Sequence, residues 1–322
     1  MTRVRKNIWI ALPFIGHLLI AAILLSPLVV SSFWLFFLAQ MVVASYVAVS
    51  FNLAYSYGRI LSFAQGAFFG VGAYIALYLA SESGWSLPLI VVVALAFTAT
   101  MGAVFGAVFV RMGGHNPTIA TVILASAALL AANALGHYTG SEDGLGIKLA
   151  FVGLGSVKIP IGPTTALYYV ASVPLVALVV AWQFVQHRDF WKVARAVASN
   201  EVRAQQLGYN VQLRRVVVFS ISAAIAGLGG VFYALLMQHV SSTVFDIALS
   251  VNAILYAVVG GVGTIVGPIL GVFIIYPLTE IIAHYFLYVQ IVIGAVLIFT
   301  AIAMPKGVLG TLFSRVRGDV GR

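Results

Sequence analysis

The sequence predicts an all-α integral membrane protein that crosses the bilayer about ten times. Of its 322 residues, 62% are hydrophobic and only 8% are charged, whereas soluble domains carry about a quarter charged residues. The mean hydropathy is +1.09. The apolar runs do not alternate as the strands of a membrane β-barrel do. We therefore predict a helix for each run, because a helix satisfies its own backbone in lipid, and one transmembrane domain over residues 1–322.

Hydropathy delimits ten candidate spans. The first is predicted to be retained, because its apolar part is about 23 residues long, against about 7–15 in a cleaved signal peptide. The eighth is short and runs into GGVGTIVGP (260–268), which predicts half of a broken helix; alternatively, 249–283 forms one span and a re-entrant turn. The ten spans are 8–30, 33–56, 60–80, 86–110, 117–135, 165–186, 216–238, 249–262, 264–283 and 286–304.

The basic residues predict the side of the membrane on which each loop lies. With the N-terminus in the cytoplasm, fifteen of the seventeen Lys and Arg residues fall on the cytoplasmic side, and only Lys148 and Lys158 fall outside. This asymmetry is the positive-inside pattern, and an even number of spans places the C-terminus in the cytoplasm as well. The net charge of +9 is thereby explained without nucleic acid as a partner.

Several kinds of chemistry are not indicated. The chain has no cysteine, so it forms neither disulfides nor thiolate metal sites, and its six histidines have no metal-ligand spacing. No G-x-x-x-x-G-K-[ST] motif for nucleotide phosphates and no H-E-x-x-H motif occurs. We expect no catalytic residues, no metal and no cofactor bound by this chain.

One long polar and basic segment, residues 187–215, interrupts the apolar sequence. It reads HRDFWKVARAVASNEVRAQQLGYNVQLRR and contains six of the seventeen basic residues. Inside it a short helix is predicted: Ser199 or Asn200 can cap its start, Glu201 suits its first turn, and Gly208 suits the position after its end. Because two helical turns are marginal in water without a partner, we expect this helix to dock into a soluble protein.

Two stretches within the spans contain polar residues or clustered glycines that an apolar helix does not require. Ser62 and Gln65 lie beside glycines in GRILSFAQGAFFGVGAY (58–74), and 260–268 can leave backbone groups free, which membranes tolerate only where they are buried or line a cavity. The spacings Gly66-x-x-x-Gly70 and Gly263-x-x-x-Gly267-x-x-x-Gly271 also suit close helix packing. These residues can serve helix packing or line a solute pathway, and the sequence does not decide between the two interpretations. The pathway candidates are Asn52, Ser62, Gln65, Gly66, Gly70, Gly260, Gly261, Gly263, Gly267 and Pro268.

Acidic residues lie mainly on the predicted outer side. The loop 136–164 contains Glu142 and Asp143 and is either a solvated connector or a docking surface for an external partner. Glu280 is the one acid near the interior of a span, where a charge costs about 2.5–3.5 kcal/mol on insertion scales. It is predicted to lie near the outer end of its span, as an interfacial carboxylate or as a gate or pathway residue.

With these landmarks in order, the chain resembles the permease subunits of branched-chain amino-acid (LIV-type) ABC importers, a group that includes urea and amide permeases. It looks most like the LivM-like half of the pair, over about residues 50–310. The landmarks are Asn52 with the 58–74 stretch, TGSEDGL (139–145), RAVASNEVRAQQLGYNVQLRRVVVFSISAAIAGLGGVFYA (195–234), SVNAILYAVVGGVGTIVGPILG (250–271) and MPKGVLG (304–310).

The resemblance implies a type II ABC importer architecture in the inner (plasma) membrane of a bacterium or archaeon. It implies three partners: a cytosolic ATPase that binds ATP and magnesium, a second homologous permease chain, and an external solute-binding protein. On this mapping, 200–208 is the coupling helix that fits a groove on the ATPase. The coupling candidates are Asn200, Glu201, Arg203, Ala204, Leu207 and Gly208; Arg203 stands where the family commonly has a small residue.

Other functions remain as alternatives. An ion-coupled secondary transporter would need ionisable residues near the middle of the membrane, and the sequence offers only Glu280. An intramembrane enzyme would need a catalytic constellation, and the sequence shows none. The stretch RMGGHNPT (111–118) departs from the family pattern, which leaves the identity of the solute open. We expect a branched-chain amino acid as the solute, with urea or amides as the alternative.

Overall fold

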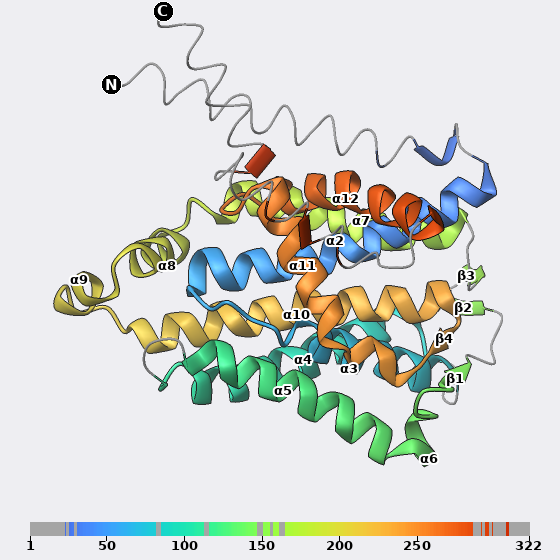
Figure 1. Ribbon diagram of the computed structural model, residues 1–322, viewed down its shortest axis with the longest axis horizontal. Helices are drawn as coiled ribbons and strands as arrows, with labels where there is room; N and C mark the ends of the chain where they lie inside the picture. Colours follow the sequence, from blue (N-terminus) through green and yellow to red (C-terminus); the bar gives the residue numbers. More distant parts are fainter. Residues whose placement is uncertain are drawn as a thin grey trace, which may run out of the picture.

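The computed structural model describes the chain in several ranges, and Figure 1 shows how its helices are arranged. These ranges are 31–81, 85–112, 116–146, 151–154, 157–160 and 165–285, with 23, 26–28, 291, 294–295, 298 and 307–308. The helices are η1 (Ser26–Leu28), α2 (Ser32–Gly58), α3 (Gln65–Ser81), α4 (Leu87–Phe109), α5 (Asn116–Ala134), α6 (Gly136–Thr139), α7 (Thr165–Val185), α8 (Asp189–Ser199), α9 (Glu201–Gln206), α10 (Val211–Met237), η2 (Ser242–Phe245), α11 (Ile247–Gly260) and α12 (Val266–Tyr285).

Eight of the ten predicted spans coincide with α2, α3, α4, α5, α7, α10, α11 and α12. Among the described residues, six helices are long and apolar enough to cross a membrane, and α3 and α11 are shorter apolar helices. The first and last predicted spans, 8–30 and 286–304, lie almost wholly outside the described residues. The number ten and the orientation of the termini therefore stay predictions.

Helix α10 forms the centre of the bundle and packs against α2, α3 and α4. Figure 1 shows it running along the molecule beside α2, with α8 and α9 at one end and the β-strands at the other. The backbones of α3 and α10 approach so closely that a Cβ on Gly230 would lie 1.9 Å from the carbonyl oxygen of Phe69. Such contacts between small residues drive helix association in lipid, where burial of apolar surface contributes little.

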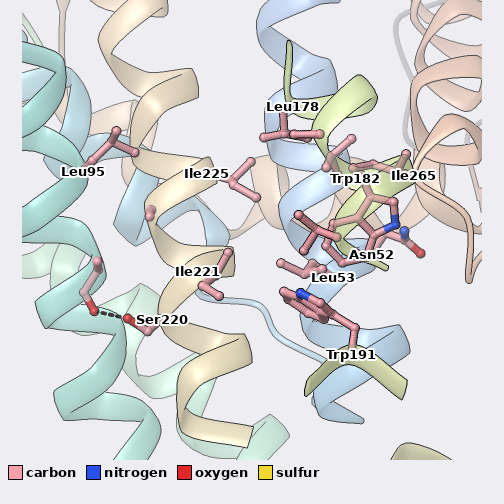
Figure 2. A pocket seen from close by; sticks show the side chains of 15 residues that line it. Asn52, Leu53, Leu95, Leu178, Trp182, Trp191, Ser220, Ile221, Ile225 and Ile265 are labelled. Atoms are coloured by element: carbon pink, nitrogen blue, oxygen red, sulfur yellow. Dashed lines mark hydrogen bonds between the residues drawn. The ribbon is translucent and has the colours of Figure 1, made fainter. Parts of the chain in front are cut away.

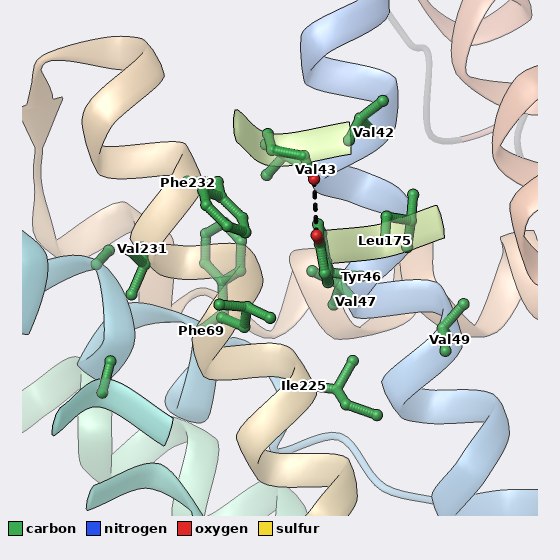
Figure 3. Close-up of a cluster of buried hydrophobic side chains, with 14 of the residues drawn as sticks. Val42, Val43, Tyr46, Val47, Val49, Phe69, Leu175, Ile225, Val231 and Phe232 are labelled. Atoms are coloured by element: carbon green, nitrogen blue, oxygen red, sulfur yellow. Dashed lines mark hydrogen bonds between the residues drawn. The ribbon is translucent and has the colours of Figure 1, made fainter. Parts of the chain in front are cut away.

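The largest buried cluster lies where α2 and α10 meet α3 and α7 (Figure 3). The ring of Tyr46 lies 5.5 Å from the ring of Phe232, and its hydroxyl donates a 2.7 Å hydrogen bond to the carbonyl oxygen of Ala171. Tyr46 is completely buried. A hydrogen bond from a buried hydroxyl to a backbone carbonyl fixes α2 against α7 in a region that is otherwise apolar.

The prediction of a continuous span over 60–80 was wrong at its start, because residues 59–64 are not helical. Arg59 adopts a left-handed backbone conformation (φ 54°) that ends α2. Ile60, Ser62 and Ala64 in this loop are buried. Side chains satisfy part of its backbone: the amide of Phe63 donates to Oγ1 of Thr121 at 3.1 Å, and that of Ala64 to Oγ of Ser62 at 3.2 Å. Buried contacts of this kind are what permits irregular backbone at membrane depth.

The break between α11 and α12 is confirmed, since residues 261–265 are not helical. Figure 1 shows α11 crossing the direction of α10 and α12. Gly263 belongs to the break, so it does not share a helix face with Gly267 and Gly271 as predicted. Gly271 packs against α11, where a Cβ on it would lie 1.8 Å from the carbonyl oxygen of Tyr256.

Two small antiparallel sheets correct the all-α prediction. Strand β2 (Phe151–Leu154) pairs with β3 (Val157–Pro160), and β1 (Leu145–Gly146) pairs with β4 (His239–Val240). Leu145 is opposite Val240, and Gly146 is opposite His239. The β1–β4 pair joins the loop predicted to face outward to the end of α10. Strands of two to four residues carry too short a pattern to be predicted from sequence.

Candidate functional site

Helix α9 projects from one end of the bundle (Figure 1). Its start is fixed by Asn200, whose Oδ1 accepts a 2.9 Å hydrogen bond from the amide of Arg203, so Asn200 rather than Ser199 is the cap. Beyond its end, Gly208 has φ +82°, the left-handed conformation that favours glycine. The predicted 200–208 helix is therefore present, with both of its ends formed as expected.

The side chains of α9 divide into an inner and an outer face. Ala204 is buried and packs with Val197 and Val211 against the bundle. On the outer face, Val202 and Leu207 are 64% and 70% exposed, and Arg203 and Gly208 are exposed too. Two prominent apolar side chains beside a cation form a surface suited to a protein groove.

An ion pair holds α9 on the central helix. Nη1 and Nη2 of Arg215 donate to Oε1 and Oε2 of Glu201 at 3.0 and 2.9 Å. The side chain of Arg215 is 13% exposed and that of Glu201 is 39% exposed. Two parallel hydrogen bonds between planar groups fix orientation as well as distance. Sequence reasoning placed Glu201 at the partner surface but missed this bond within the chain.

Helix α8 is anchored by further basic residues. Nη2 of Arg195 donates to the hydroxyl of Tyr57 at 2.8 Å, and Nη1 of Arg214 donates to the carbonyl oxygen of Phe190 at 3.3 Å. Trp191 packs against Tyr57, with ring centroids 5.3 Å apart. The basic segment 187–215 thus supplies structural contacts that hold α8 and α9 against α2 and α10.

The pathway candidate Gln65 lies in a buried polar cluster between helices. Its Oε1 accepts from Oγ of Ser50 at 2.9 Å, and its Nε2 donates to Oγ of Ser222 at 3.3 Å. Ser222 in turn donates to the carbonyl oxygen of Ser50 at 2.7 Å. All three residues are fully buried, as is Ser62. The cluster ties α2, α3 and α10 together.

Asn52 joins α2 to the break between α11 and α12. Its Oδ1 accepts from the amide of Gly263 at 3.0 Å, and its Nδ2 donates to the carbonyl oxygen of Thr264 at 2.8 Å. Gly260 ends α11, Gly261 is in the break, and Gly267 and Pro268 lie in the first turn of α12. One amide side chain therefore holds the non-helical segment in place.

The remaining candidates lie on α3 and in the turn before β1. Gly66 and Gly70 lie on α3 and pack against η2 and the first turn of α11: the amide of Gly66 donates to Oγ of Ser250 at 2.9 Å, and Gly70 faces the ring of Phe245. Glu142 and Asp143 form an exposed turn before β1, at the end of the molecule opposite α9.

Asn52 also borders a largely apolar cavity of about 470 Å³. Figure 2 shows Leu53, Trp182, Trp191 and Ile225 around it, contributed by α2, α7, α8 and α10. The hydroxyl of Ser220 is turned away to the carbonyl oxygen of Ala99 at 2.6 Å. This cavity offers apolar surface and few polar groups.

Residues 33–301 match the family described as the permease component of branched-chain amino acid transport systems. The chain belongs to this family. It is a multi-pass permease of the inner membrane and a component of an ABC transporter. Within the described residues no group of three or more His, Cys, Asp or Glu could hold a metal ion.

Individual relatives are similar to the permease at low identity. The LivH permease of Methanocaldococcus jannaschii is 23% identical over 84% of this chain and 90% of its own length. LivH of Escherichia coli K12 is 23% identical over 82% of this chain and 90% of its own. LivM of the same strain matches at 27% over 35% of this chain and 27% of its own. The permease is thus similar to both halves of the pair.

A relative named for a different solute is the autoinducer 2 import permease LsrC of Enterobacter sp. strain 638. It is 29% identical over 62% of this chain and 57% of its own length. No solved structure matches the permease. The relatives of the permease are thus named for more than one solute.

Proposed function

We propose that this permease is the membrane-spanning subunit of an ABC importer for branched-chain amino acids. A separate cytosolic ATPase, which binds ATP and magnesium, supplies the energy through α9. A second homologous permease chain completes the pore, and an external solute-binding protein delivers the solute to the end that carries Glu142 and Asp143.

The observation that carries this proposal is the geometry of α9. It is a short capped helix with Val202 and Leu207 exposed, held on the central α10 by the bond between Glu201 and Arg215. A partner can bias the pathway only by contacting its states differently, and a projecting helix rigidly joined to the central helix suits that task.

The solute assignment is supported by the LivH and LivM relatives, which are named for branched-chain amino acid transport. The likeness to LsrC supports a second candidate, another small polar solute, with urea or amides among the possibilities that the resemblance raised. An ion-coupled secondary transporter is less supported, because Glu280 is the only acidic residue within the membrane-spanning helices that the structure describes.

The test uses the absence of native cysteine. A single cysteine at Gln206 is labelled with a membrane-impermeant maleimide in intact cells and in inverted vesicles. Labelling only in inverted vesicles supports a cytosolic α9. In parallel, leucine uptake by proteoliposomes is measured with and without the ATPase; labelling from outside, or uptake without the ATPase, would refute the proposal.

A further inference from the structure

A second cavity lies among α2, α10, α11 and α12. Its volume is about 170 Å³. Met237, the last residue of α10 before β4, lines it, so the cavity lies toward the end of the permease opposite α9. Five polar side chains also line it, contributed by four different helices: Gln40, Tyr233, Asn252, Tyr256 and Tyr276.

Most of these polar groups have no hydrogen-bond partner among the described residues. The hydroxyl of Tyr276 donates to Oε1 of Gln40, and the amide nitrogen of Gln40 makes no hydrogen bond to a described residue. The side chains of Tyr233, Asn252 and Tyr256 make no hydrogen bond to any residue that the structure describes. These four side chains line the cavity, so their donors can hydrogen-bond a molecule that enters it.

Glu280 lies one helical turn beyond Tyr276 on α12. Its carboxylate interacts electrostatically with the hydroxyls of Tyr256 and Tyr276, and its side chain is exposed. Acidic residues within membrane-spanning segments are rare and commonly face a cavity or a transport path. The cavity therefore has hydrogen-bond donors within it and a negative charge beside it.

The size of the cavity restricts the ligand. Sites for drug-sized molecules measure about 300–1,000 Å³, and the volume here is about 170 Å³. The space is therefore suited to a small solute rather than to a drug-sized molecule. Val43, Val47 and Leu249 supply an apolar side. The larger cavity beside Asn52 lacks this combination, since that amide already bonds Gly263 and Thr264.

Resting on the proposed function, we propose that this cavity is a solute site for a free amino acid with an aliphatic side chain. The free donors of Tyr233, Asn252, Tyr256 and Gln40 receive the carboxylate of the solute. Glu280 attracts its ammonium group, and the valines and leucine receive its side chain. In this proposal the permease itself recognises the amino acid, at a site among α2, α10, α11 and α12.

The first measurement is binding to the purified full-length permease in detergent. A ligand that binds only the folded state raises the unfolding temperature, so leucine at millimolar concentration is titrated and the unfolding temperature is recorded. Isocaproate, which is leucine without its amino group, is the matched probe. We expect stabilisation by leucine and at least tenfold weaker apparent affinity for isocaproate. No stabilisation by leucine, or equal stabilisation by both, overturns the proposal.

Variants then assign the effect to the cavity. Tyr256→Phe removes one oxygen that has no partner among the described residues, so we expect unchanged stability without leucine and about three- to tenfold weaker leucine binding, the effect of one lost hydrogen bond. Asn252→Leu is expected to weaken leucine binding similarly, and Glu280→Gln to remove the preference for leucine over isocaproate. Asn133→Leu on α5, away from the cavity, is the matched control. Leucine binding that persists in all three cavity variants overturns the assignment.

Uptake by the reconstituted importer separates this site from the proposed function. If the wild-type complex shows no ATP-driven leucine uptake, but the wild-type permease binds leucine and the variants do not, the importer is contradicted and the site is supported. Normal uptake by Tyr256→Phe and Asn252→Leu supports the importer and overturns the site.

Discussion

The carboxylate of Glu201 and the guanidinium of Arg215 face each other through two hydrogen bonds of 3.0 and 2.9 Å, which join α9 to the first turns of α10. The two residues are 14 positions apart along the chain. Nε of Arg215 is buried without a hydrogen-bond partner among the described residues, so the carboxylate is the principal compensation for that charge.

We expect Glu201→Gln to loosen α9 and to lower ATP-driven uptake. Losing a hydrogen bond to a charged group costs about 1.5–3 kcal/mol, and Arg215 would be left largely buried without its counter-ion. Co-purification of the ATPase and uptake rates are the readouts. Lys192→Ala is the matched control, because it removes the exposed pair with Asp189, and such pairs contribute about 0–1 kcal/mol. Wild-type ATPase binding by Glu201→Gln contradicts this prediction.

A second prediction concerns Gly208. Its φ is +82°, and a Cβ added to it would meet no atom within 4 Å, so substitution affects backbone conformation alone. Left-handed backbone costs a non-glycine residue about 1–2 kcal/mol, which is about 5–30-fold in an equilibrium. Gly208→Ala should weaken ATPase association by that factor and Gly208→Pro more, whereas Gly208→Asn should be best tolerated. Equal ATPase affinity for all three variants would refute the backbone explanation.

Gln65→Leu should lower the stability of the permease. It removes both hydrogen bonds that Gln65 makes to Ser50 and Ser222, and interhelical hydrogen bonds in membranes contribute about 0.6 kcal/mol on average and up to about 1.7. Thermal unfolding in detergent measures the change. Ser45→Ala, which removes a local bond within α2, is the control. Lost uptake with unchanged stability would instead favour the pathway role.

Gly230→Ala should prevent correct packing of α3 on α10. The added methyl group would lie 1.9 Å from the carbonyl oxygen of Phe69, a contact that only separation of the two helices relieves. We expect little monodisperse protein by size-exclusion chromatography. Gly146→Ala, whose nearest contact would be 3.7 Å, should give wild-type yield. A monodisperse Gly230→Ala permease would show that the helices can move apart.

Hydropathy and capping rules located eight helices and both ends of α9 because these depend on local sequence. Asn200 and Gly208 act on backbone groups a few residues away, so their roles could be predicted. The loop 59–64 could not, since its apolar residues look helical and its partner Thr121 lies far along the chain. Tyr256 and Asn252 were likewise missed, because a hydropathy scale cannot show that side chains from four helices meet at one cavity.

The length of α10 gives the permease a direct connection between its two ends. Its 27 residues contain no proline and extend about 40 Å at 1.5 Å per residue. Glu201 is hydrogen-bonded to Arg215 in the first turns of α10, and β4, which follows the far end of α10, pairs with β1. A tilt imposed at α9 would therefore be transmitted along α10 to the turn before β1, so the two ends of the permease would move together.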